Sequence, residues 1–335
     1  MFPASPSSPT ARLRAIRRGA ALVAACVSLV ACGGEATARG QVAAGATRAA
    51  VDSGIAIADA GGRTTRLAAP ARRIVSLVPS VTETLLAIGA GDRLVGRTRY
   101  DDAPAVRGVP SVGGGLDPSV EAIVALRPDL VLAWQGETRS ELAHRLEGLG
   151  IPVFTVRLQD TTDVFRGIAA LGRLTGRDSA AAAVAASLRR DFDAVRRSVA
   201  GRPRPSVLYV VSADPPLVPG RTTFIAQLIG VAGGRSAFDD LTAPWPTVSM
   251  EEVVRRRPDV VVLPVGEFRE NAVATLRQRA AWRDVDAVRD GRIVTVDADL
   301  LNRPGANLGA AARALRDAIH PAAARAADTV APPIR

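Results

Sequence analysis

Few side chains in this sequence have the types and the spacing that catalysis needs. The 335 residues include two histidines, His144 in a polar stretch and His320 near the C-terminus, and neither stands at metal-ligand spacing from Cys, Asp or Glu. The sequence contains no Gly-x-Ser-x-Gly nucleophile motif and no pair of cysteines in a redox motif. It therefore predicts no catalytic residue, no metal site and no bound cofactor.

Two tryptophans are better candidates for a functional site. Trp134 follows an apolar stretch, residues 129–133, that is typical of a strand, and Trp245 lies in the rigid sequence Pro244-Trp245-Pro246. Large planar side chains at strand ends or in loops are suited to stack on a flat or bulky ligand. One such residue in each half of the chain predicts a ligand cleft, although packing in the core or in a loop is the alternative for both.

The two halves of the chain share one repeated segment. Residues 121–132, EAIVALRPDLVL, are similar in sequence to residues 251–262, EEVVRRRPDVVV. In each copy proline ends a helix, because it disfavours the α region for the residue before it, and a buried strand follows. Strands that alternate with helices predict a parallel sheet in each half. The matched elements are first strands at 73–78 and 206–211, helices at 83–89 and 224–230, and closing strands at 151–156 and 292–296. Ser80 or Thr82 is the expected cap of the helix at 83–89, with Glu83 as a structural residue in its first turn.

A single long helix is predicted between the two halves. Residues 177–200 are rich in alanine, have apolar positions at helical spacing, begin at Asp178 or Ser179 and end at Gly201-Arg202-Pro203. At about 1.5 Å per residue such a helix is roughly 30–35 Å long. The predicted fold is α/β: two similar lobes, 72–176 and 201–320, with central, mostly parallel sheets, joined by this rigid helix, with a ligand cleft between the lobes.

The N-terminal residues have the pattern of a targeting segment. Four arginines precede a short apolar run, residues 20–30, and Leu29-Val30-Ala31-Cys32 follows. That ending resembles a bacterial lipobox, which implies a signal peptide over 1–32 and a lipid on Cys32; ordinary secretory cleavage near Ala31 is the alternative. Residues 33–51 are predicted to form a flexible tether, 52–71 a hairpin with a turn at Gly61-Gly62, and 321–335 a tail.

Charge and cysteine content narrow the class of protein further. The net charge is +10 and every cationic side chain other than histidine is arginine; without the four leader arginines the charge is about 10 − 4 = +6. The arginines are scattered among Asp and Glu and aromatic residues make up 4%, a pattern that argues against nucleic-acid binding. Once the leader with Cys26 is removed, one cysteine is left and no internal disulfide can form, so packed cores must supply the stability.

Several further motifs resemble one known family. They are Arg73-Ile-Val-Ser-Leu-Val-Pro-Ser-Val-Thr-Glu83, Val95-Gly96, Tyr100-Asp-Asp, Val109-Pro-Ser-Val-Gly-Gly, Glu121 to Trp134, Pro244-Trp-Pro-Thr-Val-Ser249 and Asn302-Arg303-Pro304-Gly305. Over residues 72–318 the chain is similar to the iron/cobalamin periplasmic-binding domain, the substrate-binding component of ABC importers for cobalamin, haem and ferric siderophores, and most of all to its cobalamin-binding members. The resemblance implies an exported monomer, periplasmic or at the cell surface, that works with a permease and its ATPase subunits. It also implies two lobes with little hinge motion between them.

The resemblance places the ligand contacts on five residues. They are Pro79, Tyr100, Trp134, Trp245 and Arg303. The sequence departs from the cobalamin-binding members at Gly113, where those proteins have an aromatic residue, so one stacking wall is missing.

The resemblance also implies one exposed docking glutamate on each lobe for the permease. Glu251 matches the second-lobe position. Gapless alignment puts Ser140 at the first-lobe position, with Glu141 beside it and Glu137 one turn earlier, and we assign Glu141. Ordinary solvent exposure is the alternative for both glutamates.

The sequence thus predicts a binding protein for a corrinoid such as cobalamin. Haem or a ferric siderophore is the alternative, because an anionic ligand would pair with inward arginines, and Arg97, Arg99, Arg221 and Arg303 are available. A remote alternative is an exported enzyme that acts on a tetrapyrrole or a cell-wall substrate.

Overall fold

A computed structural model describes residues 54–266 and 271–321, and all structural statements below concern those residues. The signal peptide, the tether, Cys32 and residues 322–335 of the tail, as predicted from the sequence, lie outside the described residues. No helix in the described ranges is long and apolar enough to span a bilayer.

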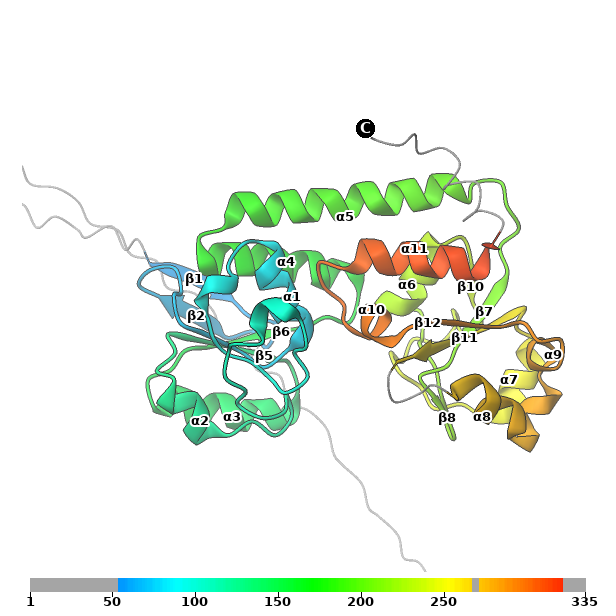
Figure 1. The fold of residues 1–335 in the computed structure, drawn as a ribbon, viewed down its shortest axis with the longest axis horizontal. Coiled ribbons are helices and arrows are strands. Elements are labelled where there is room, and N and C mark those ends of the chain that lie inside the picture. The colour runs from blue at the N-terminus through cyan, green and yellow to red at the C-terminus, as the bar shows by residue number, and fades with distance from the viewer. Residues whose placement is uncertain (1–53, 267–270, 322–335) are drawn as a thin grey trace, which may run out of the picture. The chain divides into compact units, whose positions relative to one another are not determined.

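Figure 1 shows the two lobes, each of which contains a parallel four-stranded sheet. The two sheets have the same strand order. The order is β4-β3-β5-β6 in the first lobe and β10-β7-β11-β12 in the second. Every neighbouring pair in both sheets is parallel, which confirms the predicted α/β class.

The first lobe consists of β3 (Ile74–Ser76), α1 (Pro79–Ala87), β4 (Leu94–Gly96), α2 (Val120–Ala125), β5 (Leu130–Trp134), α3 (Glu137–Gly148), β6 (Val153–Val156) and α4 (Thr161–Thr175), with short 3-10 turns at Gly91–Arg93 and Pro104–Val106. The second consists of β7 (Ser206–Tyr209), α6 (Phe224–Val231), β10 (Arg235–Ser236), α7 (Met250–Arg256), β11 (Val260–Val265), α8 (Ala272–Gln278), α9 (Asp286–Arg289), β12 (Ile293–Asp297), α10 (Ala298–Asn302) and α11 (Leu308–Ile319). A 3-10 turn at Ala280–Asp284 and a small antiparallel pair, β8 (Ser212–Ala213) and β9 (Pro216–Leu217), complete it.

The helix of the repeated segment, residues 121–132 and 251–262, begins and ends in the same way in both lobes. Ser119 caps α2 by accepting a hydrogen bond from the Ala122 amide, and Ser249 caps α7 in the same manner. At the other end Arg127 and Arg257 both have φ of 46°, the left-handed region. Proline after each of them disfavours the right-handed helical conformation, so the helix must end there.

The aspartate of the repeated segment connects its strand to the start of the first strand of the lobe through hydrogen bonds. The Asp129 carboxylate accepts hydrogen bonds from the amides of Arg72 and Arg73, at 2.8 and 2.9 Å. In the second lobe the Asp259 carboxylate accepts a hydrogen bond from the Ser206 amide at 2.7 Å. A carboxylate bonded to backbone N–H groups makes a strong, charge-assisted interaction. The Arg-Pro-Asp sequence therefore ends a helix and sets the register of the next strand.

An antiparallel hairpin lies within the predicted range 52–71 and covers the outer edge of the first sheet. Its strands are β1 (Ile55–Ala58) and β2 (Thr64–Leu67), paired antiparallel. The Asp59 carboxylate accepts hydrogen bonds from the amide and the hydroxyl of Thr155, and the Thr65 hydroxyl donates to the Val153 carbonyl. An exposed strand edge invites pairing with other chains, so side chains that satisfy the outward groups of β6 protect this edge.

The first helix of the first lobe begins earlier than predicted. The expected start was near Glu83, with Ser80 or Thr82 as cap, but α1 begins at Pro79 and has no side-chain cap. Proline at the first helical position has a suitable fixed φ and loses no hydrogen bond, which explains the early start. Ser80 and Thr82 are buried within the helix instead, and Thr84 donates its hydroxyl to the Ser80 carbonyl.

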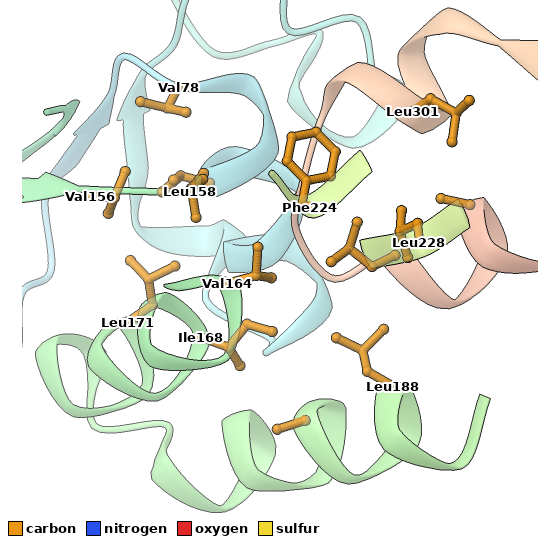
Figure 2. Close-up of a cluster of buried hydrophobic side chains, with 14 of the residues drawn as sticks. Val78, Val156, Leu158, Val164, Ile168, Leu171, Leu188, Phe224, Leu228 and Leu301 are labelled. Atoms are coloured by element: carbon orange, nitrogen blue, oxygen red, sulfur yellow. The ribbon is translucent and has the colours of Figure 1, made fainter. Parts of the chain in front are cut away.

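The predicted connecting helix is α5 (Asp178–Ser198), which we call the spine helix. It packs against α4 of the first lobe and α11 of the second. Its apolar face contributes Leu188 to a continuous buried cluster that also contains Ile168 of α4 and Leu228 of α6 (Figure 2). Leu158 and Phe224 extend this cluster into the two lobes, so the lobes share apolar packing as well as a covalent connection.

Candidate functional site

Four of the five predicted ligand-binding residues line one cavity. Pro79 follows β3, Tyr100 follows β4, and Trp134 is the last residue of β5, so all three lie at the carboxyl ends of parallel strands. Arg303 directly follows α10, which continues from the carboxyl end of β12 in the second lobe. The carboxyl ends of parallel strands are where α/β proteins bind ligands.

This interlobe cavity has a volume of 460 Å³. That volume lies in the range of about 300–1,000 Å³ typical of small-molecule sites. Its wall is mainly apolar, and three of its residues, Tyr100, Trp134 and Leu116, are 57%, 37% and 82% exposed. Large exposed apolar side chains around a hollow indicate a surface that a ligand covers.

Arg303 is surrounded by carboxylates from both lobes. Its guanidinium lies 3.1 Å from Glu83 and 2.9 Å from Asp102 in the first lobe, and 3.1 Å from Asp299 in its own lobe. It also donates to the Tyr100 carbonyl at 3.2 Å. Three anionic partners more than neutralise one guanidinium, so the positive charge of Arg303 is already paired within the protein.

The pKa values of this cluster follow from burial and from these hydrogen bonds. Burial raises the pKa of the Glu83 carboxyl above its ordinary value, although Arg303 acts in the opposite direction. The hydrogen bond from Arg303 lowers the pKa of Asp102. For Arg303 itself, burial opposes the charge, but the hydrogen bonds to Asp102 and Glu83 outweigh burial and raise its pKa. The Arg303 guanidinium is therefore charged at physiological pH.

Backbone contacts of the segment after Arg303 hold it against the first lobe. A Cβ on Gly305 would lie 2.8 Å from the Ser80 carbonyl oxygen and 2.9 Å from the Thr84 hydroxyl, so only glycine fits. The amide of Ala306 donates to the same Thr84 hydroxyl at 3.4 Å. On the other side, the Tyr209 hydroxyl donates to the Asn302 side chain at 3.0 Å. Arg303 thus lies between two fixed neighbours.

Trp245, the fifth predicted ligand contact, does not line the interlobe cavity. Its side chain is 40% exposed and packs edge-to-face on Phe224, with the ring centroids 6.3 Å apart. Backbone hydrogen bonds from Val218 to Pro246 and from Gly220 to Pro244 hold its loop. The structure therefore gives Trp245 a packing role, and its contact with a ligand stays a prediction.

The two predicted docking glutamates are both exposed and lie on helices. Glu251 is in the first turn of α7 and Glu141 is on α3. The structural repeat, however, places Glu121 at the position equivalent to Glu251, because both follow a serine cap at the start of matching helices.

Several residues of the site were not found from the sequence. Glu83 was expected to be a structural residue of the first turn of α1 and instead pairs with Arg303. Leu116 and Asp117 line the cavity from the glycine-rich loop that also contains Gly113, and Gly113 itself, with φ of 107°, is not among the lining residues. An isolated leucine after three glycines was a usable signal for Leu116, but Asp102 and Asp299 carried none.

The described residues contain no candidate metal centre at this site. Over 54–266 and 271–321, no group of three or more His, Cys, Asp or Glu side chains is arranged to hold a metal ion. The apolar wall and the planar side chains of the cavity are suited to binding a ligand.

Two α/β lobes that share a ligand-sized cavity and a connecting helix define a substrate-binding protein of the ABC-transporter class. The chain belongs to the periplasmic binding protein family, whose model matches residues 74–300. It is 31% identical over 310 residues to the uncharacterized ABC transporter substrate-binding lipoprotein YvrC of Bacillus subtilis, across 90% of this chain and 96% of that protein.

Solved structures of the same class bind different ligands. The periplasmic vitamin B12 binding protein BtuF of Vibrio cholerae is 27% identical, with a TM-score of 0.64 over 76% of this chain and 99% of that one. The periplasmic heme-binding protein RhuT of Roseiflexus is 26% identical, with a TM-score of 0.64 over 74% of this chain and 98% of that one.

Proposed function

We propose that this substrate-binding protein captures a corrinoid such as cobalamin outside the cytoplasmic membrane and delivers it to an ABC importer. The corrin ring would stack on Trp134 and Tyr100 and rest against Pro79 and Leu116, with Trp245 as a further contact from the second lobe. The cavity of 460 Å³ would take one face of such a ligand and leave the remainder exposed.

The observation that carries this proposal is the neutralised charge of Arg303. With Glu83, Asp102 and Asp299 at 2.9–3.1 Å, its guanidinium is not available to an incoming anion unless those bonds break. A large conjugated ring with uncharged amide groups on its periphery needs stacking surfaces and hydrogen bonds rather than a free cation. A corrinoid has this chemistry.

The other arginines considered for an anionic ligand support the same choice. Arg99 pairs with Asp117 at 2.7 Å, and Arg97 donates to the carbonyls of Val106 and Thr98. Arg221 is exposed and lies outside the lining of the interlobe cavity. Haem or a ferric siderophore is the second candidate, favoured by the similarity to the haem-binding RhuT.

The proposed cellular setting follows the family. The protein would be exported, carry a lipid on Cys32, act as a monomer, and dock on a permease with its ATPase subunits through Glu251 and Glu141. We propose that it catalyses no reaction.

Tryptophan fluorescence of the purified protein, titrated with cyanocobalamin, haemin, a neutral ferric hydroxamate and an anionic ferric catecholate, tests the ligand. Free N-acetyltryptophanamide titrated in parallel corrects for light absorbed by the ligands, and equilibrium dialysis confirms each affinity. We expect saturable one-to-one binding of cyanocobalamin with sub-micromolar Kd.

Variants then locate the ligand. Trp134→Ala should weaken cyanocobalamin binding at least tenfold, because it removes one stacking face, whereas Trp245→Ala reports on the second lobe. Saturation by haemin or the catecholate but not by cyanocobalamin would overturn the corrinoid proposal and leave the class of protein intact. If no tetrapyrrole or iron chelate binds, the proposed ligand chemistry is wrong altogether.

A further inference from the structure

A second cavity lies in the first lobe between the hairpin strand β1, the edge strand β6 and α4. Its volume is 470 Å³, similar to that of the interlobe cavity, and the two cavities have no lining residue in common. We call it the hairpin cavity. Because it is built from one lobe alone, transport of a ligand between the lobes does not account for it.

The floor of the hairpin cavity is apolar. It is lined by Ile57 from β1, Phe154 and Val156 from β6, and Ala170 from α4. Gly167 and Ala170, one turn apart on α4, have little or no side chain, so the helix leaves space where larger residues would fill the gap. An apolar hollow of this size is suited to an aliphatic or aromatic group.

The two carboxylates that line the hairpin cavity already have partners. Asp59 accepts hydrogen bonds from the amide and the hydroxyl of Thr155, and also from the Arg63 amide at 2.9 Å. Asp163 is held by the Arg157 guanidinium through two hydrogen bonds of 2.8 and 2.9 Å. Neither carboxylate is therefore available to attract a cation.

Two arginines of α4 on the same cavity are much less engaged. Arg166 has a side chain 72% exposed and lies 3.8 Å from Asp163, whose oxygens Arg157 already occupies. Arg173 is exposed and makes no ion pair within the described parts of the chain. The two arginines are seven positions apart, which places them two turns apart, about 10 Å, on one face of the helix.

We propose that the hairpin cavity binds a small anionic amphiphile. Its apolar tail would lie on Ile57, Phe154, Val156 and Ala170, and its carboxylate or phosphate head would pair with Arg166 and Arg173. A head group that replaces water at these guanidiniums gains charge-assisted hydrogen bonds and competes only with the long Arg166–Asp163 ion pair of 3.8 Å. The apolar floor gives this site a preference for anions that carry a chain over inorganic anions.

Isothermal titration calorimetry of the purified protein tests this site. The probes are decanoate and decyl phosphate, both below their critical micelle concentrations, with decanamide as the uncharged analogue and inorganic phosphate as the head group alone. We expect one-to-one binding of at least one anionic probe, with decanamide and inorganic phosphate at least tenfold weaker. The preferred anionic probe shows whether the natural ligand has a carboxylate or a lipid-like phosphate head.

Variants assign the binding to the hairpin cavity. Arg166→Gln with Arg173→Gln should weaken the anionic probe at least tenfold, and Ala170→Leu should do so by filling the floor, while thermal melts verify folding. Arg190→Gln, an exposed arginine of the spine helix, is the matched control and should leave the Kd unchanged.

Three results would overturn the proposal. They are no saturable binding of either anionic probe, equal affinity for decanamide, or loss of probe binding in Trp134→Ala with no effect of the α4 variants. The last result would place the amphiphile in the interlobe cavity. Since the titrations with corrinoids use the other cavity, either proposal can fail while the other stands.

Discussion

The Nη1 atom of Arg303 lies 3.1 Å from the Oε1 atom of Glu83, although 220 residues separate them in the chain. The contact joins the end of α10 in the second lobe to α1 in the first. Both side chains are partly buried, so the pair is shielded from solvent more than a surface ion pair is. Its consequences for stability can be measured without knowledge of the ligand.

Replacement of Arg303 by methionine should destabilise the protein. The change leaves three carboxylates close together without their cation, and we expect the free energy of unfolding to fall by about 1–3 kcal/mol. Urea denaturation followed by circular dichroism measures the loss. Arg196→Met, which removes an ion pair with Asp193 that is exposed on both sides, is the control and should change stability by less than about 1 kcal/mol. Equal losses in the two variants would contradict a special role for Arg303.

The raised pKa of Glu83 predicts a pH effect of definite sign. A carboxyl whose pKa is higher in the folded than in the unfolded protein gives stability that is complete below the unfolded value and lost as pH rises through the folded value. Glu83→Gln cannot ionise. The stability of the unmodified protein relative to Glu83→Gln should therefore decrease as pH rises from the ordinary glutamate range towards neutrality. Denaturation curves at several pH values test this, and a relative gain over the same interval would show that the sign is wrong.

The Asp129 carboxylate should contribute more to stability than its counterpart Asp259. Asp129 accepts hydrogen bonds from two backbone amides, those of Arg72 and Arg73, and Asp259 accepts one, from the amide of Ser206. We expect Asp129→Ala to cost about 1–3 kcal/mol and Asp259→Ala to cost less, because fewer amides lose their acceptor. Chemical denaturation of the two variants side by side gives the comparison; the reverse order would show that local packing dominates.

Arg127, which lies just after the end of α2, is expected to tolerate glycine better than positions inside a helix do. Its φ of 46° is unfavourable for a residue with a Cβ and costs glycine nothing. Arg127→Gly should therefore be neutral or stabilise the protein by up to about 1 kcal/mol. Arg190→Gly, in the interior of the spine helix, should cost about 1 kcal/mol. The melting temperatures of the two variants test this prediction. A similar decrease in melting temperature in both would contradict it.

The elements that could be predicted from the sequence are those with strong local signals. The spine helix begins at Asp178, one of the two residues expected, because alanine-rich periodicity and a Gly-Arg-Pro stop leave little ambiguity. The strands that follow the two Arg-Pro-Asp sequences also lie where the sequence pattern predicted them. The predicted start of α1 was wrong because Pro79 begins the helix without a side-chain cap.

The candidate site was only partly accessible to sequence reasoning. Pro79, Tyr100, Trp134 and Arg303 could be named, since the motifs that contain them resemble a known family, and they do share a cavity. The partners of Arg303 could not, because Glu83 and Asp102 lie 220 and 201 residues away and no local pattern links a carboxylate to an arginine at that distance. Trp245 shows the converse. Its Pro-Trp-Pro sequence suggested a ligand contact, but the residue does not line the cavity.

The apolar cluster that runs from Leu158 through Leu188 to Phe224 has a consequence for cooperativity. Melting either lobe alone would expose the apolar side chains that the other lobe and the spine helix cover, so neither lobe forms an independent thermal unit. The heat capacity of the protein should accordingly show one calorimetric transition, and each half expressed by itself should aggregate. The two lobes, although their sequences repeat, are therefore expected to unfold as a single unit.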